Sequence, residues 1–130
     1  IPKFLMEKEI GNIELPDLRI VESMHERKAL MAELADGFIA MPGGFGTLEE
    51  FCEILTWGQL GLHQKPFGLL NAEGFYDHFL AFIDNAVARQ FIKPRHRELL
   101  LTATSPTELL DCLRDFRGGL APKWMTPERS

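Results

Sequence analysis

This sequence of 130 residues lacks several features that mark large classes of protein. No apolar run approaches the roughly 20 residues that a helix needs to cross a bilayer, and no signal-peptide pattern is present, so we expect no membrane partner. Basic residues never form a run of five, and the net charge is −5, which argues against nucleic acid as a partner.

Cysteine and histidine are few and dispersed. Cys52 and Cys112 belong to no C-x-x-C motif or Cys/His cluster, which predicts two reduced, packed thiols in a cytoplasmic protein and no zinc site. The four histidines have no metal-ligand spacing and are assigned to surface or packing positions. No serine lies in a G-x-S-x-G motif, so a serine hydrolase triad has no support.

What the sequence does contain is an alternation of short apolar runs with helical patterns. With 45% hydrophobic and 25% charged residues, the composition is that of one globular domain with a modest core. The apolar runs predict four strands, at residues 19–22, 38–41, 66–70 and 99–101. Strands that alternate with helices at this spacing predict an α/β fold with a doubly wound parallel sheet.

The predicted helices carry start and stop signals. Ser23 and Glu26 form a capping-box pattern before a helix that runs to about residue 35, and Ser105-Pro106 opens another helix with an N-cap and an N1 proline. We expect Gly58 to end the helix that follows residue 47. The most strongly amphipathic pattern has apolar residues at helical spacing after the third strand: Phe75, Phe79, Phe82, Ile83, Ala86 and Val87.

This topology predicts where a ligand would bind. In a parallel α/β sheet the loops from strand to helix lie at the carboxyl edge, where ligands bind, and the loops from helix to strand lie at the opposite edge. We therefore expect residues 22–27, 42–47 and 71–75 to share the carboxyl edge. Residues 57–66, which include His63, should lie at the amino edge.

Directly behind the second strand stands the stretch M-P-G-G-F-G-T-L-E-E, residues 41–50. The bare backbone of Gly43, Gly44 and Gly46 lets N–H groups converge on an anion at the start of the next helix, where the helix dipole also favours negative charge. The stretch lacks the lysine of a Walker motif and the spacing of a dinucleotide fingerprint. The pattern leaves two interpretations open, a cradle for a single phosphate and a plain tight turn.

The spacing of Thr47 and Glu50 also has two interpretations. The pair fits a capping box with Thr47 as the N-cap and Glu50 at N3, and the residues alone favour that structural role. Glu49 and Glu53 lie close by on the same predicted helix, so three acids gather beside the proposed anion site. A carboxylate in such a place has a chemical use if it faces sugar hydroxyls, a developing cation or an attacking water.

Arg27 interrupts an apolar stripe formed by Met24, Met31 and Leu34 on its predicted helix. A lone arginine in such a stripe commonly packs its stem and extends its head to water. Alternatively, its guanidinium meets a phosphate or a carboxylate at the edge of the sheet that carries the glycines.

Together these motifs resemble the paired signatures of the LOG ("Lonely Guy") family, P-G-G-x-G-T-x-x-E with an upstream R-K pair. The R-K pair is Arg27-Lys28 here, and the glycine motif spans residues 42–50. The similarity continues through T-W-G-Q-L-G at 56–61, K-P-F-G-L-L-N at 65–71 and G-F-Y-D at 74–77, and so covers most of the chain.

The resemblance implies a fold, a reaction and a set of roles. Members of the family are cytokinin riboside 5'-monophosphate phosphoribohydrolases with a modified Rossmann fold, so it implies hydrolysis of the N-glycosidic bond of AMP or an N6-substituted AMP. It also implies a homodimer, which the apolar helix around Phe51 and Trp57 weakly supports, and no metal or cofactor. Arg27 and Glu50 would form the catalytic pair. The implied substrate-binding residues are Lys28, Gly43, Gly44, Gly46 and Thr47, of which the glycines and Thr47 would hold the 5'-phosphate.

The sequence departs from the family pattern in one respect. Family members carry an amino-terminal half with another glycine-rich loop, and nothing in this sequence corresponds to it. We therefore expect residues 1–117 to form the carboxyl-terminal portion of a single Rossmann-like nucleotide-binding domain without its first strands, followed by a tail at residues 118–130.

Two other functions compete with the hydrolase. The first is a Rossmann-like module that binds or carries a nucleotide without chemistry. The second is lysine decarboxylation, a label attached to similar sequences, which needs pyridoxal phosphate on a lysine. Lys28 and Lys65 are the only lysines between residues 9 and 92, and neither has the surroundings of a Schiff-base site.

Overall fold

A computed structural model describes residues 2–7 and 14–116 of the chain, which divides into two compact units, Ile1–Ala35 and Asp36–Ser130. Each unit is described by itself. The predicted tail at residues 118–130 lies outside the described residues.

The first unit contains two helices, α1 (Lys3–Glu7) and α2 (Met24–Leu34). The start of α2 confirms the predicted capping pattern, because the Glu26 N–H donates to Ser23 Oγ at 3.1 Å. The Glu26 carboxylate in turn accepts from the N–H of Glu22 at 3.1 Å, one residue before the N-cap. The first bond satisfies a backbone donor that the first turn of a helix leaves without a partner in the helix itself, and the second ties the residue before the N-cap to that turn.

The strand predicted at residues 19–22 is wrong. Val21 forms an isolated parallel bridge with Pro2, and the N–H of Lys3 donates to the Val21 carbonyl at 2.7 Å. Arg19 forms a local ion pair with Asp17 at 3.1 Å. A strand needs a ladder of hydrogen bonds along its length, and a single bridge supplies too few to extend it.

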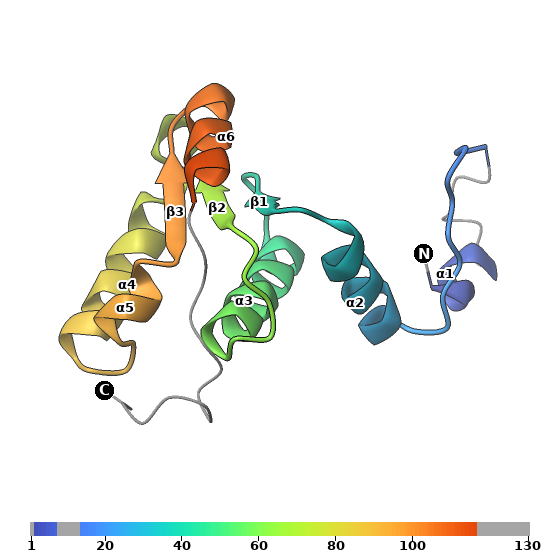
Figure 1. Cartoon of the computed structure of the whole chain (residues 1–130), viewed down its shortest axis with the longest axis horizontal. Coiled ribbons are helices and arrows are strands. Elements are labelled where there is room, and N and C mark those ends of the chain that lie inside the picture. Colours follow the sequence, from blue (N-terminus) through green and yellow to red (C-terminus); the bar gives the residue numbers. More distant parts are fainter. Residues whose placement is uncertain (1, 8–13, 117–130) are drawn as a thin grey trace. The chain divides into compact units, whose positions relative to one another are not determined.

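The second unit is an α/β sheet in which three strands lie side by side and point the same way (Figure 1). Their order is β1-β2-β3, and all pairs are parallel, so the predicted α/β class with a parallel sheet is confirmed. The elements are β1 (Phe38–Ala40), α3 (Phe45–Gln59), β2 (Phe67–Leu70), the short 3₁₀ helix η1 (Ala72–Gly74), α4 (Asp77–Ala88), α5 (Pro94–Arg97), β3 (Leu100–Ala103) and α6 (Pro106–Asp115).

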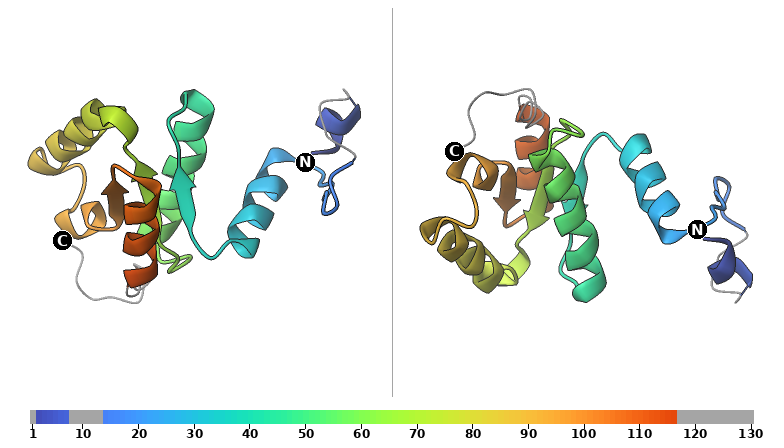
Figure 2. Two further views of the ribbon diagram at one scale, coloured as in Figure 1. Left: turned by 90° about the horizontal axis from the view of Figure 1, so that it is seen from above. Right: turned by 90° about the horizontal axis from the view of Figure 1, so that it is seen from below.

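Helices cover both faces of this sheet, with α6 across the strands from α3 and α4 (Figure 2). Successive side chains of a strand point to opposite faces, so Phe67 and Leu69 share one face and Gly68 lies on the other. The Phe67 ring meets Phe51 of α3 edge to face, with ring centroids 6.1 Å apart. On the other face, a Cβ added to Gly68 would lie 2.8 Å from Leu109 of α6, so the glycine lets that helix approach closely.

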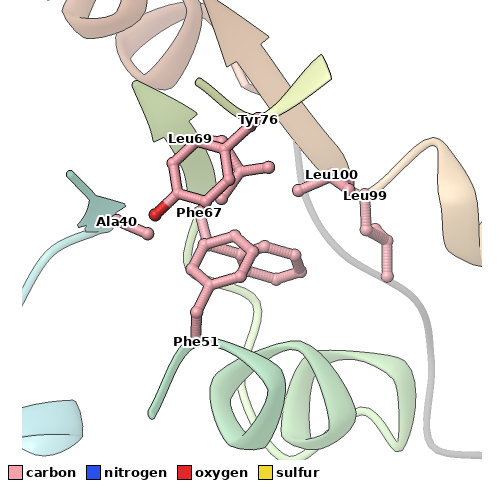
Figure 3. Packing of buried hydrophobic residues seen from close by; sticks show 7 residues of the cluster. All are labelled: Ala40, Phe51, Phe67, Leu69, Tyr76, Leu99 and Leu100. Atoms are coloured by element: carbon pink, nitrogen blue, oxygen red, sulfur yellow. The ribbon is translucent and has the colours of Figure 1, made fainter. Parts of the chain in front are cut away.

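The hydrophobic core lies between the sheet and helices α3 and α4. Figure 3 shows its buried side chains, with Phe51 of α3 beside Phe67. Phe79 and Ile83 of α4 pack against it, as the amphipathic pattern predicted, but Phe75 and Phe82 are 52% and 66% exposed and do not belong to it. Phe75 precedes the helix, which starts at Asp77, and Phe82 lies on the outer side of it. The buried cluster consists of Ala40, Phe51, Phe67, Leu69, Tyr76, Leu99 and Leu100.

Two further predictions are corrected by the helices. Gly58 lies inside α3 and does not end it. A glycine is needed at this position because the ring of Phe67 packs so closely that an added Cβ would be 2.8 Å from Cε1. The left-handed turn after the helix falls instead at Gly61, with φ +76°. The two cysteines are exposed free thiols, since the fully buried positions of their helices are occupied by neighbours such as Phe51 and Leu109.

The amino edge of the sheet is closed by aromatic packing around His63, which confirms the placement predicted for residues 57–66. The His63 ring lies 5.6 Å from the ring of Phe38 and 5.9 Å from that of Phe67, the first residues of β1 and β2. Its Nδ1 accepts from the Lys65 N–H at 3.0 Å, so Nε2 carries the proton that is donated to the Ile54 carbonyl, also at 3.0 Å.

Candidate functional site

The carboxyl edge of the sheet brings the glycine loop (residues 42–47) next to the loop after β2. The Tyr76 hydroxyl donates a hydrogen bond of 2.5 Å to the carbonyl of Met41, and the two residues are 35 positions apart in sequence. The prediction that residues 42–47 and 71–75 share this edge is therefore confirmed. Residues 22–27, which were expected there too, belong to the first unit.

The glycine loop turns directly into the first turn of α3. Gly44 is the N-cap, and the first intrahelical bond runs from the N–H of Leu48 to its carbonyl at 3.1 Å. A glycine N-cap has no side chain to accept from the first-turn N–H groups of Phe45, Gly46 and Thr47, and that turn contains no acidic residue. N–H groups without a capping side chain at the positive end of a 15-residue helix are suited to an anion.

The predicted capping box at Thr47 is wrong, because the helix begins earlier than the sequence pattern suggested. Thr47 is the third residue of α3 and Glu50 is the sixth, so neither occupies the position that such a box requires. The Thr47 side chain instead folds over the loop, where a Cβ added to Gly43 would collide with its Oγ1. Gly43 is thus needed for the close approach of Thr47.

Gly44 and Gly46 have a different environment from Gly43. A Cβ added to either one would meet no other atom within 4 Å, and neither has a positive φ. Steric crowding inside the described structure therefore does not explain why these two positions are glycine. A ligand that approaches the backbone closely would explain it.

Glu50 lies one helical turn beyond the loop. Residues three and four apart share a face of a helix, so Glu50 lies on the same face of α3 as Gly46 and Thr47. Glu50 is half-buried, whereas Glu49 is exposed and lies about 100° around the helix. Its position excludes the capping role and puts Glu50 on the face of α3 that continues from the glycine loop.

The other two predicted site residues lie in the first unit. Arg27 and Lys28 follow the first turn of α2, where the N–H of Arg27 donates to the Ser23 carbonyl at 3.0 Å, and both residues are half-buried. Within the second unit, the structure brings together the three glycines, Thr47 and Glu50.

A polar network at this edge was missed by the sequence analysis. Asn71, the residue after β2, accepts from the N–H of Tyr76 at 2.7 Å and donates from Nδ2 to Asp77 at 2.8 Å. Its own N–H donates to the carbonyl of Ala103 in β3 at 2.8 Å. Burial raises the pKa of the Tyr76 phenol, which keeps it protonated as a donor. The signal in the sequence was a polar residue directly after a buried strand, at the start of residues 71–75, which were predicted to lie at this edge.

No helix within residues 2–7 and 14–116 combines the length and the hydrophobicity needed to cross a membrane. Over the same residues, no three side chains of histidine, cysteine, aspartate or glutamate are grouped so that they could bind a metal ion.

Comparison with known proteins identifies relatives along most of the chain. Residues 1–113 match the model of a family described as "Possible lysine decarboxylase". The chain is 52% identical over 116 residues to the cytokinin riboside 5'-monophosphate phosphoribohydrolase LOG of Oryza sativa subsp. japonica, an alignment that covers 89% of this chain and 48% of that protein. It is 51% identical to the phosphoribohydrolase LOG1 of Arabidopsis thaliana, over 89% of this chain and 54% of that protein. The chain thus spans about half the length of the curated relatives it matches.

Proposed function

Because the chain belongs to the family described as possible lysine decarboxylases, and the predicted resemblance to LOG proteins is confirmed, we propose that its protein is a nucleotide N-glycosidase. The reaction is hydrolysis of AMP or an N6-substituted AMP, such as a cytokinin riboside 5'-monophosphate. Water forms a bond to C1' of the ribose while the bond from C1' to the base breaks, and the base leaves with a proton. The products are the free base and ribose 5-phosphate.

The observation that carries this proposal is the juxtaposition of an uncapped helix start with a carboxylate one turn away. The N–H groups of Phe45, Gly46 and Thr47 bind the 5'-phosphate, which removes the need for a capping side chain at Gly44. Glu50, on the same face of α3, is then close to the ribose. Breaking the glycosidic bond generates an oxocarbenium-like cation, which a carboxylate stabilises while it positions or deprotonates the attacking water.

Arg27 and Lys28 are proposed as substrate-contacting residues on the support of the R-K pair in the family motif. An arginine offers a planar fork of donors to a phosphate or a carboxylate, and a lysine offers a point charge. We propose that Arg27 is catalytic together with Glu50 and that Lys28 binds the nucleotide. The homodimer is likewise proposed mainly from the resemblance. Of the two residues that had suggested an uncovered apolar surface, Phe51 is buried in the core and Trp57 is half-buried.

The description of the family as possible lysine decarboxylases raises a different chemistry. A decarboxylase of that kind needs a lysine for pyridoxal phosphate at the ligand-binding edge. In the described part of the second unit, Lys65 lies in the segment that leads into β2, at the opposite edge, and Lys93 is the N-cap of α5, outside the loops that follow β1 and β2. The placement of these two lysines therefore favours the glycosidase.

The test is to incubate the protein expressed from its complete gene with AMP, with N6-isopentenyl AMP and with adenosine, and to measure the free base by chromatography. We expect base release from the nucleotides and far less from adenosine, because adenosine has no phosphate for the glycine loop. Binding of AMP without release of adenine would identify a nucleotide-binding module. Equal turnover of AMP and adenosine would remove the phosphate cradle from the mechanism.

The proposed dimer is tested separately by light scattering, which should report twice the mass of the polypeptide. A monomer at micromolar concentration would contradict it. Absorption of a bound pyridoxal cofactor in the purified protein, together with carbon dioxide release from lysine, would support the decarboxylase and overturn the glycosidase.

A further inference from the structure

Tyr76, the only tyrosine of the sequence, joins two loops at the carboxyl edge. Its side chain is almost completely buried, with 2% exposure, and its hydroxyl points toward the end of β1 near Ala40 (Figure 3). The acceptor is the carbonyl of Met41, the last residue before the glycine loop. The bond therefore fixes the backbone at the point where the chain leaves the sheet and enters the loop.

The tyrosine is itself held by the rigid part of the sheet. Its N–H is bound by the Asn71 side chain, and the Asn71 N–H is bound by the carbonyl of Ala103 in β3. Its ring packs edge to face on Phe79, with centroids 6.0 Å apart, and belongs to the core cluster. A chain of hydrogen bonds thus runs from β3 through Asn71 and Tyr76 to the start of the glycine loop.

Besides the first turn of α3 and the contact between Thr47 and Gly43, the described structure shows little that holds the glycine loop. The side chain of Met41 is 64% exposed, and Pro42 and Gly44 are also exposed, so burial does not fix this segment. Glycines lose more conformational freedom on ordering than other residues do. Backbone N–H groups bind an anion well only when they already point toward it, since the cost of ordering them is otherwise subtracted from the affinity.

We infer that Tyr76 is a positioning residue, whose hydroxyl holds the glycine loop in the conformation that binds the 5'-phosphate of the substrate. This inference rests on the proposed function and extends it to a residue outside the family motif. Tyr76 acts through the loop and need not touch the substrate. The alternative is that the bond to Met41 merely satisfies a buried hydroxyl and serves stability alone.

The decisive variant is Tyr76→Phe, which keeps the ring in the core and removes the tether. We expect KM for AMP to rise about three- to tenfold, the effect of one net hydrogen bond, while kcat changes by less than about twofold. Residual turnover of adenosine, which does not use the cradle, should not change. Product inhibition by ribose 5-phosphate should weaken by the same factor as KM rises.

Phe51→Leu serves as the matched control, because it loosens the same core without touching the tether. It should lower the melting temperature while the ratio of kcat/KM for AMP to that for adenosine stays at the wild-type value. In Tyr76→Phe that ratio should fall three- to tenfold. A purely structural role would leave the ratio unchanged in both variants and would overturn the inference.

Amide hydrogen exchange at residues 43–47 of the ligand-free protein supplies a readout that does not depend on activity. Exchange should be faster in Tyr76→Phe than in the wild type and unchanged in Phe51→Leu. If the wild-type protein did not prefer AMP to adenosine, the proposed function would fail, and exchange would still decide whether Tyr76 holds the loop. Unchanged exchange in Tyr76→Phe would overturn the inference in either case.

Discussion

The two edges of the sheet use the same residue types for opposite purposes. At the amino edge Gly58 is buried against the Phe67 ring, and both nitrogens of His63 are bonded to backbone groups. At the carboxyl edge Gly44 and Gly46 have space beside them, and the start of α3 has no capping side chain. The presence of a glycine in α3 therefore does not by itself reveal its role. The space around its Cα does, because a crowded glycine permits close packing and an uncrowded one leaves room for a ligand.

This difference predicts that substitutions at the two edges have different effects on stability and on activity. Changes at the amino edge should reduce the free energy of unfolding and leave the chemistry of the folded protein intact. Changes at the carboxyl edge should impair binding or turnover and leave the fold intact, except where a residue there is a helix cap. The following substitutions test that difference, from the largest expected effect to the smallest.

Glu50→Gln should have the largest effect. The variant keeps the size and polarity of the side chain but loses the charge that the proposed mechanism requires, so kcat should fall by about 10² to 10⁴ while AMP still binds. Steady-state kinetics and calorimetry measure the two quantities. Glu49→Gln, on the exposed side of α3, is the control and should retain most activity. Near-normal turnover in Glu50→Gln would remove this residue from the mechanism.

Gly58→Ala tests the amino edge. The added Cβ would lie 2.8 Å from Cε1 of a buried ring, and the resulting strain should lower the free energy of unfolding by about 1–3 kcal/mol. Chemical denaturation measures this loss. Below the unfolding transition, kcat and KM for AMP should equal those of the wild type. A large change in either would mean that the two edges are not independent.

Gly46→Ala makes the same change as Gly58→Ala in the same helix, but here we expect stability to be kept or raised and binding to be impaired. Alanine is the better helix former and has room here, so stability should rise by about 0.5–1 kcal/mol. The methyl group should hinder the approach of the phosphate, and affinity for AMP should weaken about tenfold, equivalent to one hydrogen bond to a charged group. Unchanged affinity together with higher stability would assign this glycine no part in binding.

Ser105→Ala should have the smallest effect. It tests the exception at the carboxyl edge, a residue that caps a helix and should affect stability but not activity. Ser105 follows β3 and caps α6, where its Oγ accepts from the N–H of Glu108 at 3.2 Å. Loss of the cap should cost about 1 kcal/mol of stability, measured by denaturation, without an effect on kcat. A selective loss of AMP affinity in this variant would extend the candidate site to the loop after β3.

Local patterns predicted much of the second unit correctly. The apolar runs at 38–41 and 66–70 gave strands within one residue of those observed, and Ser105-Pro106 marked the start of α6. Short-range signals succeed there because periodicity and capping depend on neighbours in the sequence. The run at 19–22 failed because a strand exists only with a partner, and a run of four residues does not specify one.

The site was predictable to the extent that its residues are adjacent in sequence. The glycines, Thr47 and Glu50 were named from the sequence as candidates, and their part in binding or catalysis stays a prediction. The capping role that the residues alone favoured for Thr47 and Glu50 was wrong, because the start of the helix could not be located from the sequence. Asn71 lies in a segment that was predicted at this edge, but neither its hydrogen bonds nor the part played by Tyr76 was predicted. Their hydrogen bonds connect β3, the loop after β2 and the end of β1, which no local pattern brings together.

The sequence by itself determined the alternation of strands and helices, the parallel sheet and the position of the glycine loop behind a buried strand. These depend on hydrophobic periodicity and on the backbone freedom of glycine, which are properties of short segments. Tertiary structure alone decided which glycines are crowded, where α3 begins and which hydroxyl secures the loop. Those features depend on packing between segments far apart in sequence, such as Tyr76 and Met41, which are 35 residues apart, and such contacts exist only once the chain has folded.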